Sequence, residues 1–508
     1  FKPWFSWASS GVLGPATEID QYTVDLTTLV PVAGFPAVLV ALDIMDPAHD
    51  EAGLQGTDPV GTGPYVFNAF EPRSKLVLDS YADYWGGTPN YSRITFRIIP
   101  EQATRVDALL TGEVDAINSI SVEDIARIEA SEDTKIASSP TTRHVMIALR
   151  NDRAPLDNPL VRQAMNYAVD REAITSTILS GIAVPVDGFF APSMPYAQND
   201  LGPWPYDPQK AADLLVEAGY DGEPIVMAVG AGRYPSDDLV GLAVAEMLTD
   251  AGFNIDYRGI DYSTMQAELG LKGDAEYDAW LQGWGATFLD SVGQIQGFFR
   301  GPNESELPVF YNNEDYFAAA DRFHAATSED ERRAAVNDME TIVWNDAGGL
   351  FLYFPMDNFG IASNVQGFEA RFDEFFIFSD TTLGDAPAAT AAPATTAAPA
   401  TTAAPAEELP ELIVAIGQDI PSLDSRLPGG SAGSISVVRH ITEPLVRYSA
   451  TADEILPVLA ESWEQIDELT WRFKLRQGVT FHNGAAMDAA SVVWSVDRAI
   501  SGVDFKPW

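Results

Sequence analysis

The feature that most constrains this chain is a low-complexity stretch at residues 384–410, GDAPAATAAPATTAAPATTAAPAEELP. It consists largely of Ala, Pro and Thr, with no large apolar residue before Leu409. Such a segment cannot bury enough surface to offset the entropy lost on ordering, so we expect an extended linker. Polyproline II geometry, at about 3.1 Å per residue, gives it a reach of roughly 80 Å. It can therefore join two distant points of one folded body, or two separate bodies.

The length and the charge of the chain limit its class. A chain of 508 residues predicts two or three domains, because single cores stop growing beyond about 250–300 residues. A net charge of −44 repels phosphate backbones, so we expect no nucleic-acid partner. The acidity has two interpretations, an ordinary acidic secreted protein or adaptation to high salt, where screening relieves self-repulsion. The absence of cysteine excludes disulfides, thiolate nucleophiles and thiolate metal sites.

The ends of the sequence carry a further signal. FKPWFSWASSG at the start lacks a charged leader followed by an apolar core, so we expect no signal peptide here. The most apolar run, residues 30–42, is short and broken by proline, which predicts a soluble chain without a membrane helix. FKPW occurs at residues 1–4 and again at 505–508. This repeat suggests that the end of the chain runs on into its own beginning.

Strand and helix patterns alternate on both sides of the linker, which predicts an α/β fold. The clearest helix begins near Asp157 or Asn158 as the cap, with Pro159 in the first turn and an apolar stripe over 161–169. Residues 223–260 predict a strand–helix–strand unit.

Taken in rotated order from Glu411, the chain resembles the family 5 solute-binding proteins, which are dipeptide, oligopeptide and nickel receptors of ABC importers. The stretches that carry the resemblance are SLDS at 422–425, ITEPLV at 441–446, LPVLAESWE at 456–464, WRFKLRQGVTFHNG at 471–484, AASVVWSVDRAI at 489–500, VGTGPYVF at 60–67, YADYWGG at 81–87, LLTGEVDA at 109–116, NPLVRQAMNYAVDREAI at 158–174, YDPQKAADLLVEAGY at 206–220 and YDAWLQGW at 277–284. In the family's usual order the block 411–508 comes first and residues 5–382 follow. We therefore predict a circular permutant whose original ends are joined by the linker; a fragment of tandem copies is the alternative.

The resemblance implies a two-lobed periplasmic-binding-protein-like fold of class II with an extra subdomain. The predicted parts are a first lobe at 61–143, 356–383 and 411–450, a subdomain at 5–60 and 451–508, a second lobe at 144–355, and the linker at 384–410. The linker also resembles the spacer behind the lipid-anchored cysteine of surface lipoproteins, which implies an anchored natural form outside the cell.

A ligand site is implied in a cleft between the lobes. Residues 283–291 match the loop that, in peptide-binding members, carries an aspartate for the ligand's α-amino group. That position is Thr287 here, and Asp290 matches a later aspartate of the loop. Because a hydroxyl cannot balance a desolvated ammonium, we expect an oligosaccharide-like ligand or a modified peptide, with Trp284 as a stacking platform. An ordinary di- or oligopeptide, and core packing of Trp284, are the alternatives.

Four more residues are candidate ligand contacts. Arg233 and Tyr234 follow a strand end, where Arg233 can fork onto a ligand carboxylate or form a surface ion pair. Glu443 lies at the turn after the first-lobe helix, where family members often face the cleft, and a structural helix-end carboxylate is the alternative. His440 is either a ligand contact or a satisfied interface histidine.

Signals for an enzyme are weak. GGSAG at 429–433 matches G-x-S-x-G but lacks the strand and helix that a nucleophile elbow needs. No histidine pair has metal-ligand spacing, and no nucleotide-binding fingerprint occurs. Paired carboxylates for glycoside hydrolysis are the rival hypothesis. We predict a non-catalytic, monomeric extracellular receptor without cofactor or metal, which hands a small solute to the membrane subunits of an ABC importer by hinge closure.

Overall fold

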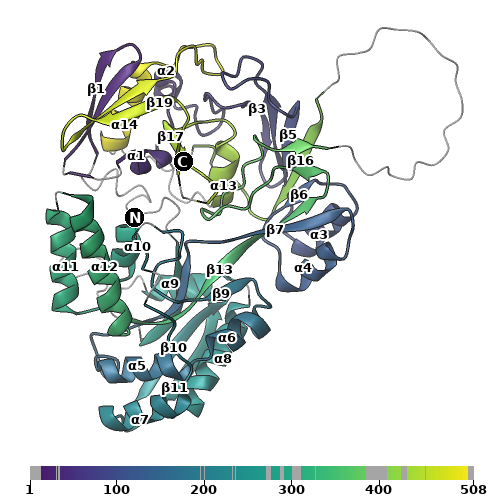
Figure 1. The fold of residues 1–508 in the computed structure, drawn as a ribbon. Coiled ribbons are helices and arrows are strands. Elements are labelled where there is room, and N and C mark those ends of the chain that lie inside the picture. Colours follow the sequence, from purple (N-terminus) through teal and green to yellow (C-terminus); the bar gives the residue numbers. More distant parts are fainter. Residues whose placement is uncertain are drawn as a thin grey trace, which may run out of the picture. The chain divides into compact units, whose positions relative to one another are not determined.

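Figure 1 shows the fold as a computed structural model in which the chain forms two units. Unit 1 comprises Phe1–Ser138, Asn358–Ala450 and Glu454–Trp508, and unit 2 comprises Ser139–Asp357 with Thr451–Asp453. The structure describes residues 13–29, 31–32, 35–194, 196–198, 201–231, 233–234, 236–269, 276–285, 291–299, 311–326, 328–384, 409–420, 422–424, 432–451 and 454–501. The FKPW repeat, linker residues 385–408, Thr287 and Asp290 lie outside the described residues. The predicted boundaries of the lobes and subdomain stay a prediction.

The main sheet of unit 1 combines residues from both sides of the linker. Its strands, in spatial order, are β13 (Gly349–Ala362), β6 (Ala116–Ile117), β16 (Glu411–Ile416), β5 (Arg93–Ile98), β4 (Lys75–Ser80) and β3 (Tyr65–Glu71). The green β16 in Figure 1 pairs in parallel with β5 and with β6. It is apolar on both faces: Leu412 and Val414 join one core cluster and Ala415 joins the other. A strand buried on both faces is expected in the middle of a sheet.

A second, four-stranded sheet of unit 1 also joins both chain segments. Its order is β1 (Leu13–Asp20), β2 (Thr23–Thr28), β20 (Thr470–Leu475) and β19 (Ala460–Gln465). Figure 1 shows its purple and yellow strands side by side. Arg472 of β20 donates to Asp25 of β2 through two hydrogen bonds of 2.8 Å. The other elements of unit 1 are α1 (Phe35–Val38), η1 (Leu39–Ala41), α2 (Pro47–Glu51), α3 (Gln102–Leu110), α4 (Val122–Glu129), β14 (Val365–Gln366), β15 (Thr382–Leu383), α13 (Ala432–Val438), β17 (Val446–Tyr448), β18 (Ile455–Pro457) and α14 (Ala489–Ser501).

The sheet of unit 2 has the order β11 (Asn254–Asp261), β10 (Pro224–Ala231), β12 (Ala279–Trp284), β8 (His144–Leu149) and the first part of β13, with β9 (Ala183–Pro185) also paired to β13. β7 (Thr134–Pro140) and β13 each continue from one unit into the other. The helices of unit 2 are α5 (Pro159–Ala168), α6 (Arg171–Ala173), η2 (Ile174–Ile178), α7 (Pro208–Ala218), α8 (Asp237–Asp250), α9 (Tyr262–Leu269), α10 (Ser291–Phe298), α11 (Glu314–Ala325) and α12 (Glu329–Asn345). No helix within the described ranges is long and apolar enough to cross a membrane.

Local sequence signals explain several of these elements. Asn158 is the cap of α5, because its side chain accepts a hydrogen bond from the Leu160 N–H at 3.0 Å and Pro159 opens the helix. The predicted strand–helix–strand unit at 223–260 is present as β10, α8 and β11, with β10 and β11 parallel.

A buried arginine joins α6 to the sheet of unit 2. Arg171 donates to the carbonyl oxygens of Phe351 at 2.6 Å and Asn166 at 2.9 Å, and to Asn166 Oδ1 at 2.8 Å. Burial lowers the pKa of its guanidinium to about 9. The guanidinium is therefore held by carbonyl dipoles, and its removal leaves several buried acceptors without a donor.

We expect Arg171→Met to lower the free energy of unfolding by about 3 kcal/mol or more, because each buried unsatisfied acceptor costs about 1–3 kcal/mol. Urea unfolding followed by fluorescence measures this change. Arg322→Met is the matched control, since Arg322 is 58% exposed and pairs with Asp338 on the surface. Equal, small losses in both variants would contradict the structural role of Arg171.

Candidate functional site

Two glycines bring distant segments into close contact in unit 1. A Cβ on Gly61 would lie 2.1 Å from the Ile441 carbonyl oxygen, and one on Gly63 would lie 2.7 Å from that of His440. The Gly63 N–H donates to Ile441 O at 2.8 Å. Because no larger residue fits at either position, the VGTGPY sequence holds Thr62 beside the turn that carries Glu443.

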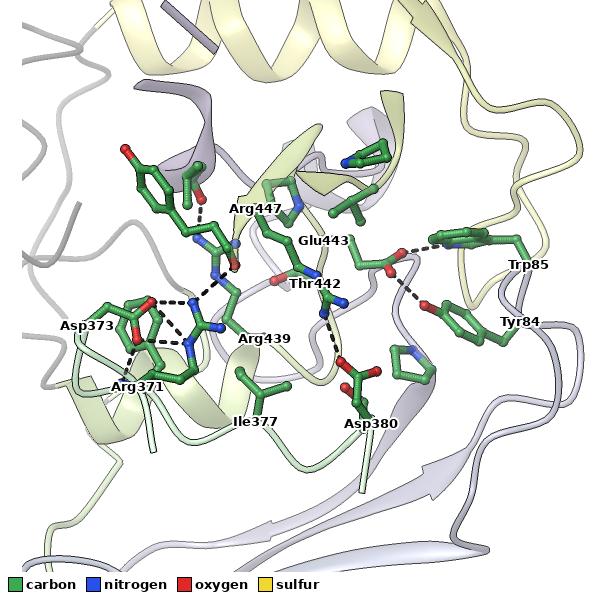
Figure 2. Close-up of a pocket in the computed structure, with 18 residues that line it drawn as sticks. Tyr84, Trp85, Arg371, Asp373, Ile377, Asp380, Arg439, Thr442, Glu443 and Arg447 are labelled. Carbon is green, nitrogen blue, oxygen red and sulfur yellow. Dashed lines mark hydrogen bonds and ion pairs between the residues drawn. The ribbon is translucent and has the colours of Figure 1, made fainter. Parts of the chain in front are cut away.

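The Glu443 carboxylate is buried and accepts three hydrogen bonds. The donors are Trp85 Nε1 at 2.8 Å, the Tyr84 hydroxyl at 2.8 Å and Thr62 Oγ1 at 2.9 Å; Figure 2 shows the first two. Burial raises the pKa of Glu443 to about 7, although all three donors lower it. Glu443 thus acts as a common acceptor for two segments that come from the other side of the linker.

Glu443 forms part of the wall of a pocket of about 150 Å³ within unit 1 (Figure 2). Its lining comes from η1, from Pro64, Tyr84 and Trp85, and from the segments 371–380, 439–448 and 457–458. Besides Glu443, the charged lining residues are Arg371, Asp373, Asp380, Arg439 and Arg447. The pocket is therefore lined by charges of both signs. No cluster of three His, Asp or Glu able to hold a metal ion occurs in the described part of the chain.

His440 lies in the core behind this pocket. The Phe378 N–H donates to Nε2 at 3.0 Å, and Nδ1 lies 2.8 Å from the Ser436 carbonyl oxygen. This pattern fixes the tautomer with the proton on Nδ1. Burial lowers the pKa of His440 to about 4, so the ring is neutral. Both ring nitrogens are engaged by the backbone, which leaves neither for a ligand.

The candidates from unit 2 gather at the end of β12. The Tyr234 hydroxyl donates to Gly283 O at 3.0 Å and accepts from Gly283 N–H at 2.9 Å. Arg233 is exposed, and its guanidinium carbon lies 5.3 Å from the centroid of the Tyr234 ring. Trp284 follows Gly283, is partly exposed, and packs edge to face on Phe298 with centroids 6.1 Å apart. Tyr234 therefore positions the strand end that presents Trp284.

The structure places Arg233, Tyr234 and Trp284 near one another in unit 2, and their role as ligand contacts stays a prediction. The sequence did not single out several residues that surround the unit 1 pocket. These are Thr62, Tyr84, Trp85, Asp380 and Arg447. The GTG and YWGG sequences carried a usable signal, because paired glycines mark close backbone approach. Asp380 and Arg447 have no such signal in the sequence.

The comparisons with known proteins identify the family. Residues 8–306 and 454–505 match the bacterial extracellular solute-binding proteins, family 5 Middle. Because this match covers more than half of the chain, the chain belongs to that family, a class of binding proteins of ABC importers. The predicted family and α/β binding-protein fold are thereby confirmed.

Particular relatives give further context. The glutathione-binding protein GsiB of Pectobacterium atrosepticum is 28% identical over 375 residues, which cover 72% of this chain and 73% of that protein. Its counterpart in Escherichia coli K12 is 29% identical over 378 residues, with the same coverage. HbpA2 from Haemophilus parasuis has a TM-score of 0.66 at 21% identity, covering 75% of this chain and 78% of that one. DppA from Helicobacter pylori in complex with the peptide STSA has a TM-score of 0.60 at 22% identity, covering 75% and 76%.

GsiB is a glutathione-binding protein, and DppA is a periplasmic binding protein associated with an ABC transporter. Family 5 proteins bind small ligands such as peptides and serve ABC importers, which agrees with the predicted receptor class. The circular permutation stays a prediction. An oligosaccharide ligand has no support among these relatives, whereas the peptide alternative fits them.

The raised pKa of Glu443 predicts a pH dependence of stability. Between its ordinary pKa of 4.5 and its folded value of about 7, the folded protein binds more protons than the unfolded chain. The free energy of unfolding therefore falls as the pH rises through this range, by up to about 3 kcal/mol from this group. Glu443→Gln removes the titrating group and its contribution to stability. The free energy of unfolding of the wild type minus that of this variant should therefore decline from pH 5 to pH 7 and level off above.

Urea unfolding at several pH values measures this difference. Glu464→Gln, which changes an exposed residue of β19, is the control and should show no such trend. A difference that rises with pH between 5 and 7 would show that Glu443 is not held at a raised pKa.

Proposed function

We propose that the chain is an extracellular receptor that captures a small peptide and delivers it to the membrane subunits of an ABC importer. The observation that carries this proposal is the unit 1 pocket, which is lined by three arginines and three acidic residues beside ordered aromatic side chains. A peptide presents an ammonium, a carboxylate and amide groups that such a lining can pair. The glutathione-binding and peptide-bound relatives support the same ligand class.

The pocket offers less to a neutral oligosaccharide. Trp85, whose ring is of the kind that stacks on sugars, is covered by the Arg476 guanidinium 4.3 Å from its centroid, and its N–H is engaged by Glu443. Thr287, the residue that favours an uncharged ligand, lies outside the described residues. We therefore prefer the peptide alternative to an oligosaccharide.

The roles of the individual residues follow from their contacts. Within unit 1, we propose Glu443 as part of the wall of the pocket and His440 as the residue that holds the backbone bordering it. Within unit 2, we propose Arg233 and Trp284 as ligand contacts and Tyr234 as the residue that positions the strand end beside them. Hinge closure would follow if the ligand binds one arrangement of the units better than another. The Ala/Pro/Thr linker is typical of spacers behind lipid-anchored cysteines, which supports an anchored natural form.

A thermal-shift screen tests the ligand class. We expect glutathione or short peptides such as Ala-Ala-Ala to raise the unfolding temperature, because a ligand at 100 times its Kd adds about 2.7 kcal/mol of stability. Maltotriose is the matched neutral probe and should have no effect. Stabilisation by maltotriose but by none of the peptides, or turnover of chromogenic glycosides, would overturn the proposal.

We also propose that a single chain builds all of unit 1, as a circular permutant would. This rests on β16, which lies between β5 and β6, and on β20, which pairs with β2. The alternative is a fragment of tandem copies, in which residues after the linker belong to a second body.

Cutting the linker tests this proposal. A protease site placed within residues 385–408 should give two fragments that stay together at the mass of one chain in native gel filtration. The fragments should separate only in denaturant, because β16 pairs with β5 and β6 in one sheet of unit 1 and β20 pairs with β2 in the other. The uncut protein with the same site is the control. Fragments that part without denaturant, or that elute as an exchanged dimer, would favour the tandem-copy alternative.

A further inference from the structure

We propose that the ion pair of Arg447 and Asp380 is a subsite for an α-amino-acid head group, in which an ammonium and a carboxylate sit on one carbon. This inference rests on the proposed peptide-binding function. In the bound state, Asp380 would take the ammonium of the ligand and Arg447 would take its carboxylate. The protein's own ion pair would be exchanged for two pairs with the ligand.

The three arginines of the pocket differ sharply in how firmly they are held (Figure 2). Arg371 is 14% exposed, with its Nη2 2.6 Å from Asp373 and its Nε donating to both oxygens of that carboxylate. Arg439 is 10% exposed and is paired to buried Asp43 at 3.3 Å. Both guanidinium groups are therefore fixed parts of the pocket wall.

Arg447 is held far less firmly. Its side chain is 45% exposed and makes a single contact of 3.1 Å, from Nη1 to Asp380 Oδ2, and Asp380 is 63% exposed. A guanidinium has five N–H donors; within the described residues the other four meet no acceptor, and Asp380 Oδ1 meets no donor. An exposed ion pair contributes about 0–1 kcal/mol, so a ligand can displace it at little cost.

Although these charges are exposed, their backbone is well anchored. His440 accepts a hydrogen bond from the Phe378 N–H, and Asn90 Nδ2 donates to the carbonyl oxygens of Ser379 at 3.3 Å and Thr381 at 3.0 Å. Asp380 thus sits between two fixed points. Arg447 lies in β17, which is paired with β18. Well-anchored backbones that present exposed charges are pre-organised for binding, because little conformational freedom is lost.

The size and charge of the pocket select one end of a ligand. At about 150 Å³ it is smaller than the roughly 300–1,000 Å³ of pockets that enclose a whole small ligand. In an ordinary peptide the free ammonium and the free carboxylate lie at opposite ends. In a γ-glutamyl peptide such as glutathione both groups sit on the α-carbon of the glutamyl residue. That head group can pair with Asp380 and Arg447 at once, and relatives of this chain bind glutathione.

Isothermal titration calorimetry with two probes tests the inference. Glutathione carries the complete head group, whereas in N-acetylglutathione the ammonium is replaced by a neutral acetamide. We expect the wild type to bind glutathione at least tenfold more tightly than the acetylated probe. Asp380→Asn should abolish this preference, and Arg447→Gln should weaken the binding of both probes at least tenfold.

The matched control is Arg93→Gln, because Arg93 is 43% exposed and forms an ion pair of 2.7 Å with Asp79 away from the pocket. This variant should bind both probes as the wild type does. All three substitutions change exposed pairs, so unfolding temperatures close to the wild-type value would confirm that the variants fold.

The outcomes separate this inference from the function on which it rests. If glutathione or Ala-Ala-Ala binds but the acetylated probe binds equally well and the Asp380 and Arg447 variants are unaffected, the subsite is wrong while the receptor function stands. If neither glutathione nor Ala-Ala-Ala binds to the folded wild type, both proposals fail.

Discussion

The site of this protein depends on one buried carboxylate and its three donors. Removing a carboxylate from water is costly, and only strong hydrogen bonds offset that cost. Glu443 receives them from Thr62, Tyr84 and Trp85, which lie 381, 359 and 358 positions away in the sequence. The interaction fixes the pocket wall only if these distant segments meet. The three hydrogen bonds to Glu443 therefore form only if the segments on both sides of the linker pack together in unit 1.

The rest of unit 1 makes that meeting possible. Two glycines allow backbone contact beside Ile441, and β16 enters the sheet between β6 and β5. His440 then holds the Phe378 backbone so that the next residues border the pocket. The glycines act through the absence of a side chain, β16 acts through apolar burial, and His440 acts through a neutral imidazole that accepts a hydrogen bond. Together they place exposed charges on a well-anchored backbone, which favours selective binding because little conformational freedom is lost.

Local signals allowed much of the fold to be predicted from the sequence. The Asn158–Pro159 start of α5 and the alternation over 223–260 depend on neighbouring residues, and both were found. The motifs taken in rotated order from Glu411 identify the family from the sequence alone. The contacts of the site were harder, because Tyr84 and Trp85 find their acceptor only through tertiary structure. The segment that carries Asp380 has no period that predicts a helix or a strand. The Tyr234 hydroxyl bonds to the backbone of Gly283, and no pattern in the sequence reveals that contact.

The central claim is that this receptor holds a small charged peptide in the pocket of unit 1. Native mass spectrometry of the protein as purified, followed by fragmentation of any released solute, tests it most directly. The account predicts a retained molecule of the peptide class that carries a free α-amino-acid end. A retained neutral oligosaccharide would contradict it.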